Sequence, residues 1–387
     1  MTGQATGSLR IGEQIGQDGK RNGTPIDLAS KDLVTHGVIV GMTGSGKTGL
    51  ALALIEETLL SGVPVLMIDP KGDLGNLCLT FPNLAAADFA PWIAKGDDAE
   101  KVAATWKEGL AGWGLDGTNI QRLRDAAPVT IYTPGSRAGV PLNVIGSMAP
   151  PVGADEETRN DEIEAFVSGL LKLVGIDSDP LSSREHILLS NLITAAWEAG
   201  STVDLAGLIA QIQQPPMRKL GVIELDTFFP PKDRADFALR INGLLASPSF
   251  AAWLEGEALD IQRLLFGADG APRAAIISIA HCSDDERMFL VTLILSKVVA
   301  WMRAQQGTTD LRALVYMDEV FGYVPPTAVP PSKKPILTIL KQARAFGVGL
   351  VVATQNPVDV DYKALSNAGT WLIGRLQTEQ DKARLMD

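Results

Sequence analysis

The chain has 387 residues, of which 46% are hydrophobic, and it carries a net charge of −11 with an isoelectric point near 4.9. This length and apolar content are enough for one large or two modest domains with a well-buried core. The acidic balance argues against a protein that coats nucleic acid with a broadly basic surface, although net charge leaves the local distribution of charge open.

The sequence carries no pattern of secretion, membrane insertion or metal clustering. Residues 1–23 are polar and rich in glycine, unlike a signal peptide. The most apolar stretch, Phe289–Met302, has 14 residues and is predicted as a buried core helix because it is too short to cross a bilayer. The two cysteines, Cys78 and Cys282, are predicted as semi-buried thiols of a cytoplasmic protein. The three histidines lack metal-ligand spacing and are interpreted as structural: His36, His186 and His281.

Strands and helices alternate along most of the chain. Turn signals predict a short hairpin region over residues 1–35. Short apolar runs predict buried strands, and longer periodic runs predict helices. The predicted strands are 38–40, 64–69, 128–133, 274–279, 313–317, 350–353 and 370–373, and the predicted helices between them are 50–60, 286–305 and 336–346. This order predicts a mostly parallel sheet with helices on both faces, built from residues 36–149 and 270–387.

Residues 150–269 have a different texture. Helical periodicity dominates there, and glycine and proline separate one helix from the next. We expect an α-helical subdomain inserted into the strand-helix core. The proline-rich residues 324–335 are predicted as an exposed loop, and a last helix is predicted over residues 378–386. This last helix lacks a C-terminal capping signal, and we expect either that the natural protein continues or that this is a truncated gene product.

The most informative segment is residues 41–48, GMTGSGKT, a complete G-x-x-x-x-G-K-T phosphate loop between a predicted strand and a predicted helix. Glycine allows backbone conformations in which amide groups surround an anion. Lys47 is predicted to reach the β- and γ-phosphates, and the Thr48 hydroxyl to ligate Mg²⁺. The absence of a guanine-specific Asn-Lys-x-Asp stretch favours ATP. The predicted nucleotide-binding residues are Gly41, Thr43, Gly44, Ser45, Gly46, Lys47, Thr48 and Gly49.

Two further strands end in residues that suit ATP hydrolysis. Strand 313–317 ends in Asp318 and Glu319, predicted to hold Mg²⁺ and to activate water, respectively. The other reading is a pair of acids that ends a strand in solvent. Strand 350–353 delivers Gln355, predicted to sense the γ-phosphate or to contact the attacking water, unless it caps a loop backbone group.

The order of GMTGSGKT, LMIDPKGD, LVYMDEV, LKQARAFGVGLVVATQNP and WLIGRLQTEQDKARLMD resembles the HerA/FtsK superfamily of ring-forming DNA-translocating ATPases, and HerA-like proteins in particular. The resemblance implies a RecA-like P-loop NTPase fold of the ASCE type. It also implies that Arg344 acts on the nucleotide of a neighbouring subunit and that Arg375 contacts ATP. A surface arginine is the other reading for both. Arg384 is interpreted as a surface charge.

The resemblance also implies a hexameric, ATP-hydrolysing motor that translocates or unwinds duplex DNA, like a helicase. Only 40 residues precede the phosphate loop, too few for the N-terminal β-barrel of HerA-like proteins, so a nuclease or other effector partner stays open. A conjugation or secretion-type ATPase that moves protein or protein-DNA cargo is an alternative, as is a nucleotide-gated scaffold in an anti-phage system. A small-molecule kinase fits less well, because the Asp318–Glu319 pair suits water attack. The roles of Lys71 and Asp73 are undefined: they belong to a plain turn or contact nucleotide, neighbour or pore.

Overall fold

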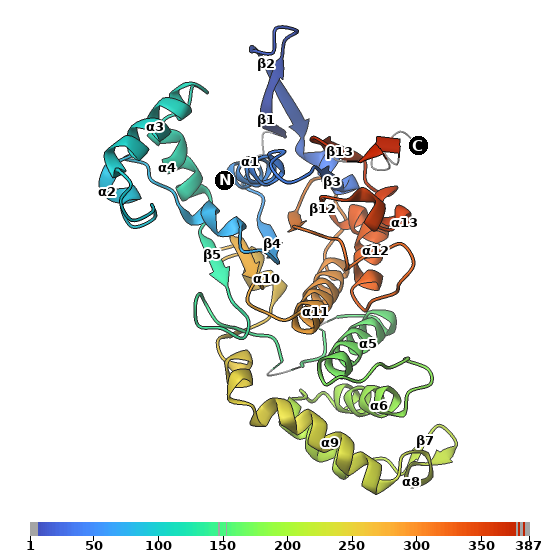
Figure 1. The fold of residues 1–387 in the computed structure, drawn as a ribbon. Helices are drawn as coiled ribbons and strands as arrows, with labels where there is room; N and C mark the ends of the chain where they lie inside the picture. The colour runs from blue at the N-terminus through green and yellow to red at the C-terminus, as the bar shows by residue number, and fades with distance from the viewer. Residues whose placement is uncertain (1–6, 146–147, 152, 377, 380–381, 384–387) are drawn as a thin grey trace.

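The computed structural model describes residues 7–145, 148–151, 153–376, 378–379 and 382–383 (Figure 1). Its centre is a seven-stranded sheet in the order β13-β3-β12-β11-β4-β10-β5, and all neighbouring strands in it are parallel. The predicted α/β class with a parallel sheet is therefore confirmed. The strands are β3 (Gly37–Val40), β4 (Val65–Asp69), β5 (Val129–Tyr132), β10 (Ala274–Ser278), β11 (Ala313–Met317), β12 (Val348–Thr354) and β13 (Thr370–Ile373).

Helices cover both faces of the sheet, which explains why the central strands are continuous apolar runs. Every residue of β4, β11 and β12 is buried. Alternate residues enter opposite cores: Leu66 and Ile68 face the side of α11 (Asp284–Arg303) and α12 (Lys333–Gln342), whereas Val65 and Met67 face α1 (Lys47–Leu60). The predicted core helix over Phe289–Met302 is confirmed as the middle of α11.

The strand order decides where the motifs meet. Strand β3 leads to the phosphate loop, β12 leads to Gln355, and β11 leads to Asp318. These three strands are consecutive in the sheet, with β12 in the middle. Because all three run in the same direction, their carboxyl ends lie at one edge of the sheet, where ligands bind in open α/β folds.

The region between β5 and β10 is largely helical and lies below the sheet in Figure 1. Helix α5 packs along α11, and α6, α7 and α9 follow outward from it. The parallel pair β6 (Leu142–Asn143) and β9 (Glu257–Ala258) joins the two ends of this region. Its other elements are α5 (Glu156–Leu173), α6 (Arg184–Glu198), α7 (Leu205–Gln213), β7 (Lys219–Leu220), β8 (Ile223–Glu224), α8 (Leu225–Phe228), α9 (Pro231–Ala246), η3 (Pro248–Leu254) and α10 (Ile261–Leu265).

Two features project from the sheet near α1. One is the antiparallel hairpin of β1 (Ser8–Ile15) and β2 (Arg21–Ala29). The other is an arm of η2 (Leu74–Cys78), α2 (Ala86–Phe89), α3 (Ala99–Ala111) and α4 (Gly117–Ala126), to which the sequence analysis assigned no structure (Figure 1). The arm carries well-capped helices, but Trp92 and Trp106 remain more than half exposed, so no buried apolar stripe marked it in the sequence.

Three details differ from the sequence-based expectations. The predicted helix 336–346 is α-helical only to Gln342 and ends in the 3₁₀ turn η4 (Ala343–Phe346), which carries Arg344. Cys78 is exposed rather than semi-buried, whereas Cys282 is buried. Only the middle of loop 324–335 is exposed, because its two ends pack into the core. Most of the predicted helix 378–386, with Arg384, lies outside the described residues.

The remaining short elements are η1 (Ser30–Thr35), η5 (Pro357–Asp359) and α13 (Tyr362–Leu365). Among the described residues, no helix combines the length and the apolar character needed to cross a bilayer.

Candidate functional site at the carboxyl edge of the sheet

The phosphate loop, residues 41–48, connects β3 to α1 in a conformation that depends on glycine. Gly44 and Gly46 have φ angles of 76° and 86°, in the left-handed region that favours glycine. A Cβ atom on Gly41 would lie 2.3 Å from the Ser45 Oγ atom. That hydroxyl is buried and has no hydrogen-bond partner among the described residues. An unpaired buried donor beside a helix N-terminus suits an anion.

Lys47 and Gln355 contact the same carboxylate oxygen of Glu319, and Asp318 and Thr43 lie next to them. Lys47 Nζ lies 2.7 Å from Glu319 Oε1, and Gln355 Nε2 donates to the same oxygen at 2.6 Å. Lys47 Nζ is also 3.8 Å from Asp318 Oδ1. Thr43 Oγ1 donates to Gln355 Oε1 at 2.8 Å, which links the phosphate loop to β12. The structure therefore brings together residues that lie up to 312 positions apart in the sequence.

A third donor to Glu319 comes from a residue whose role the sequence left undefined. Lys71 Nζ lies 2.6 Å from Glu319 Oε1. It follows β4 in a turn organised by Asp69, whose carboxylate accepts hydrogen bonds from the backbone amides of Lys71, Gly72 and Leu74. The same loop leaves Asp73 exposed. A lysine after an apolar strand is not a distinctive signal, so only the strand order could identify this contact.

Glu319 has unusual backbone geometry and unequal carboxylate oxygens. Its φ of 47° is in the left-handed region, which costs a non-glycine residue about 1–3 kcal/mol and clusters at functional sites. Oε1 accepts three hydrogen bonds, whereas Oε2 is buried and has no partner among the described residues. The side chain therefore has one oxygen fixed by donors and one oxygen free to accept a proton.

Opposing effects set the pKa values of the two acids. Burial would raise the pKa of Glu319, but hydrogen bonds from Lys47, Lys71 and Gln355 outweigh it and lower the pKa below the usual value. For Asp318, burial outweighs the attraction of Lys47 and raises the pKa. The hydroxyl of Tyr316 donates to Asp318 Oδ1 at 3.1 Å and orients this carboxylate.

The remaining predicted residues lie at or away from this edge. Arg375 is next to the phosphate loop, since its backbone oxygen accepts a hydrogen bond from the Met42 amide at 2.9 Å, and its side chain is exposed. Thr48 and Gly49 lie in the first turn of α1. Arg344 precedes β12, at the opposite edge, where it is exposed and pairs with no acid among the described residues.

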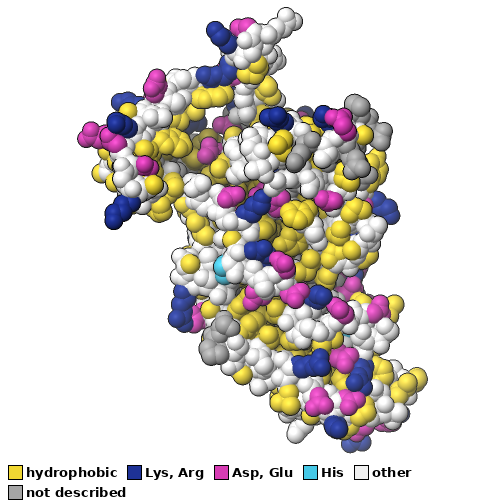
Figure 2. Space-filling model, viewed as in Figure 1, with side chains coloured by type: hydrophobic (Ala, Val, Ile, Leu, Met, Phe, Trp, Pro, Cys, Tyr) yellow, Lys and Arg dark blue, Asp and Glu magenta, His cyan; other side chains and the backbone are white. Residues whose placement is uncertain are grey.

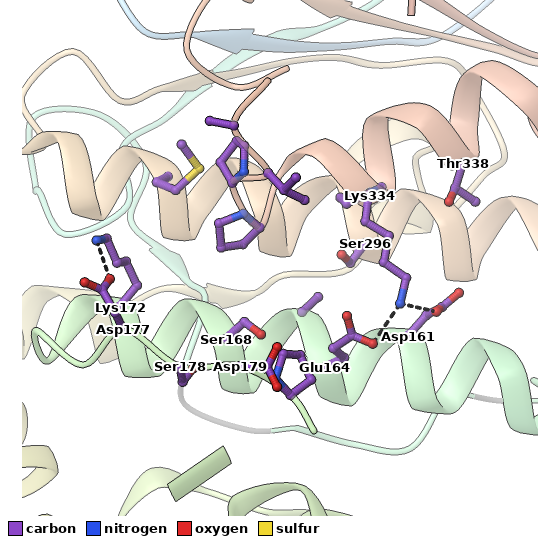
Figure 3. A pocket seen from close by; sticks show the side chains of 18 of the residues that line it. Asp161, Glu164, Ser168, Lys172, Asp177, Ser178, Asp179, Ser296, Lys334 and Thr338 are labelled. Atoms are coloured by element: carbon purple, nitrogen blue, oxygen red, sulfur yellow. Dashed lines mark hydrogen bonds and ion pairs between the residues drawn. The ribbon is translucent and has the colours of Figure 1, made fainter. Parts of the chain in front are cut away.

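A large cavity lies elsewhere, between α5, α11 and the loop that precedes α12 (Figure 3). Its volume is about 1000 Å³, and no residue of the phosphate loop lines it. Lys334 forms ion pairs there with Asp161 and Glu164, and Lys172 pairs with Asp177 (Figure 3). The pairs of Lys334 join the helical region to the core, so we interpret the cavity as a structural junction.

Part of the chain matches a known protein family. Residues 9–105, which include β1, the phosphate loop and β4, match the family described as "Helicase HerA, central domain". The match makes this segment similar to a HerA central domain. The predicted resemblance to the HerA/FtsK superfamily is thereby confirmed. Comparison with curated protein sequences gives no match.

Solved structures share the fold of this chain. VirB4 of Thermoanaerobacter pseudethanolicus is similar with a TM-score of 0.56 at 13% identity, covering 98% of this chain and 87% of VirB4. The unbound conjugative coupling protein TrwBΔN70 gives a TM-score of 0.48 at 13% identity, covering 93% of this chain and 74% of TrwB. TrwB in complex with ADP and Mg²⁺ gives 0.48 at 12% identity, covering 94% and 77%. The likeness to VirB4 agrees with the RecA-like P-loop fold.

Proposed function

We propose that this protein is a Mg²⁺-dependent ATPase that assembles into a hexamer and uses hydrolysis to translocate or unwind duplex DNA. The convergence of Lys47, Asp318, Glu319 and Gln355 beside a phosphate loop carries the proposal. The HerA-type match over residues 9–105 gives it a family context.

The residues present suit ATP and Mg²⁺. Gly44 and Gly46 shape the phosphate loop, and the unpaired Ser45 hydroxyl faces no competing acceptor in the described residues. Thr48 and Asp318 would hold Mg²⁺, a hard cation that prefers oxygen ligands and usually keeps phosphate and water in its shell. The ion would neutralise charge on the phosphates. A closed protein cage is not needed, which agrees with the lack of any cluster of three His, Cys, Asp or Glu ligands in the described part of the chain.

Each protein group then has a separate task. Lys47 leaves Glu319 to bind the phosphates, as expected for the lysine of a phosphate loop. Glu319 Oε2, buried and unpaired, accepts the proton of the attacking water. Gln355 lies between Thr43 and Glu319, so it can report the presence of the γ-phosphate to β12. Arg375, beside Met42, is proposed to contact ATP.

Arg344 is proposed to complete a neighbouring subunit's site. It precedes the seven residues of β12, whereas Gln355 follows them. At about 3.3 Å per residue, the strand separates Arg344 from its own site by roughly 20 Å. An arginine supplied in trans can accelerate phosphoryl transfer by ~10³–10⁵. A lone subunit should therefore hydrolyse ATP slowly.

DNA contact is proposed for the assembled ring rather than for a lone subunit. On the face seen in Figure 2, Lys and Arg side chains are interspersed with Asp and Glu, without a broad basic patch. This agrees with the net charge of −11. A ring can still concentrate a few basic side chains from several copies around its axis.

A mixing experiment tests the shared site. Glu319→Gln and Arg344→Ala should each be inactive alone and should each bind Mg-ATP. When the two variants are mixed in the presence of linear duplex DNA, ATPase activity should return, because some subunit interfaces then combine an intact Glu319 with an intact Arg344. Mixtures that stay inactive although wild-type mixtures are active would contradict the trans role.

A second candidate is a conjugation or secretion-type ATPase, and the fold shared with VirB4 over 98% of this chain favours it. The two candidates differ in cargo and share the hydrolytic site. Stimulation of the wild-type ATPase by linear duplex DNA alone supports the first candidate. Activity that responds to a protein substrate and not to DNA supports the second.

A further inference from the structure

Lys71 approaches Glu319 from a loop that is held in place by backbone hydrogen bonds. Asp69 Oδ1 accepts from the amides of Lys71 and Gly72 at 3.2 and 2.7 Å, and Oδ2 accepts from Leu74 at 3.0 Å. Gly72 has a φ of 85°, which lets the chain turn back immediately after the lysine. The loop therefore fixes the Lys71 backbone beside β11, and the side chain needs only to extend.

The contacts divide the two oxygens of Glu319 into separate roles. Oε1 accepts from Lys47, Lys71 and Gln355 at 2.7, 2.6 and 2.6 Å. Oε2 is buried and has no partner among the described residues. A general base works best when a second group orients it and leaves the accepting atom free. Donors on Oε1 provide that orientation without blocking Oε2.

Not all three donors are available during catalysis. Lys47 belongs to the phosphate loop, and its proposed task is to bind phosphates. Gln355 is neutral and is tied to Thr43 of the same loop. Lys71 belongs to neither the phosphate loop nor β12, and Asp69 holds its backbone in place independently of both. Its ammonium can therefore stay on Glu319 after Lys47 has left.

A retained cation is useful at this position for two reasons. Glu319 has a strained backbone, with a φ of 47°, and such conformations persist only where the surroundings hold them. A carboxylate next to a triphosphate is also repelled by it, and a charge-assisted hydrogen bond counteracts that repulsion. Lysine suits the task because its compact charge donates in several directions.

We propose that Lys71 is a positioning residue, which holds Glu319 Oε1 during hydrolysis so that Oε2 faces the attacking water. This inference rests on the proposed ATPase function and adds to it a residue whose role was undefined in the sequence analysis. It predicts that loss of the ammonium slows the chemical step and leaves nucleotide binding intact.

Steady-state ATPase kinetics provide the first test. Lys71→Met should lower kcat by about ten- to a hundredfold, less than most of the ~10²–10⁴ that a general base contributes, because the base is misplaced and not removed, with the Kd for Mg-ATP nearly unchanged. Lys71→Arg should restore part of kcat, because it restores a charged donor. Lys232→Met, which removes an exposed lysine on α9, is the matched control and should behave like wild type. A kcat that is unchanged or raised in Lys71→Met, or a Kd that rises in proportion to the fall in kcat, would overturn the proposal.

Amine reactivity gives a second test that needs no turnover. Trace acetylation of lysines, quantified by mass spectrometry of the peptide that contains Lys71, is compared between wild type and Glu319→Gln in the presence of Mg²⁺ and a non-hydrolysable ATP analogue. Lys71 should be protected in wild type and more reactive in Glu319→Gln, with Lys232 as the exposed reference. Equal reactivity of Lys71 in the two proteins would overturn the proposal.

The two tests separate this inference from the proposed function. A wild-type protein without ATPase activity would count against the function, and the acetylation result would still decide whether Lys71 stays on Glu319. If the wild-type protein hydrolyses ATP and the Lys71→Met variant is equally fast, the result would count against the inference alone.

Discussion

The carboxyl edge of the sheet and the helical region between β5 and β10 solve the burial of charge in different ways. At the edge, one buried carboxylate, Glu319, collects two lysines and an amide on a single oxygen and leaves the other unpaired. In the helical region, Oε1 of buried Glu162 pairs with Lys297 of α11 and its Oε2 also has no partner among the described residues, while other acids pair with Arg303 and Lys334. The difference is that the edge places three donors on one oxygen atom, whereas Glu162 Oε1 has a single cation.

The difference suggests which charges serve chemistry and which serve packing. The pairs of the helical region join α5 to α11 and α12 across a core of apolar side chains. The edge cluster instead joins three neighbouring strands and the phosphate loop, and it includes a residue with a strained backbone, Glu319. Substitutions at the edge should therefore change activity with little effect on folding, and substitutions in the helical region should do the reverse.

The largest expected effect is on turnover at the edge. Glu319→Gln should reduce the ATPase rate by about 10²–10⁴, the usual contribution of a general base, while Mg-ATP binding and the unfolding midpoint stay near wild type. Glu164→Gln, which makes the same chemical change on α5, is the control and should keep its activity. Normal turnover in Glu319→Gln would remove this residue from the mechanism.

The next effect concerns stability in the helical region. Lys297→Met leaves Glu162, which is 1% exposed, without its cation, and breaking a buried pair typically costs about 3–5 kcal/mol. The free energy of unfolding, measured in urea, should fall by this amount. Adding Glu162→Gln should recover much of the loss, because no buried charge remains. A double variant as unstable as Lys297→Met would show that packing, not charge, dominates there.

A third effect tests the opposite edge of the sheet through pH. His36 is buried, its Nδ1 atom accepts a hydrogen bond from the Leu350 amide, and burial lowers its pKa from 6.5 to about 4. The unfolded chain then binds a proton that the folded chain does not, so stability falls as pH drops from 6.5 towards 4. The loss should approach about 3 kcal/mol.

Unfolding in urea at several pH values measures this loss. In His36→Asn, which has no group that titrates in this range, this part of the pH dependence should disappear. An unchanged pH profile in that variant would assign the acid lability to other groups.

The smallest expected effect refines the role of Gln355. Thr43→Ala removes the hydrogen bond to Gln355 Oε1, worth about 1 kcal/mol, and should slow turnover by roughly fivefold while leaving stability unchanged. Thr43→Ser keeps the hydroxyl and should remain close to wild type. Equal rates for the two variants would mean that this contact does not position Gln355 for hydrolysis.

Much of the sheet could be predicted from the sequence, because its strands are buried on both faces. The predicted strands 313–317 and 370–373 coincide with β11 and β13. The phosphate loop and the Asp318–Glu319 pair could be predicted because fixed spacing follows from the shape of the site. Lys71 could not be placed, since its contact depends on the strand order and on the turn formed by Asp69. The arm over residues 74–127 escaped prediction because its tryptophans are exposed.

The most direct test of the central claim is the steady-state ATPase rate per subunit as a function of protein concentration, with and without linear duplex DNA. A shared site at the carboxyl edge predicts a rate that rises with concentration, as subunits supply Arg344 to one another, and that rises again with DNA. A negligible rate that does not change with concentration or with DNA, in a protein that binds Mg-ATP tightly, would contradict it.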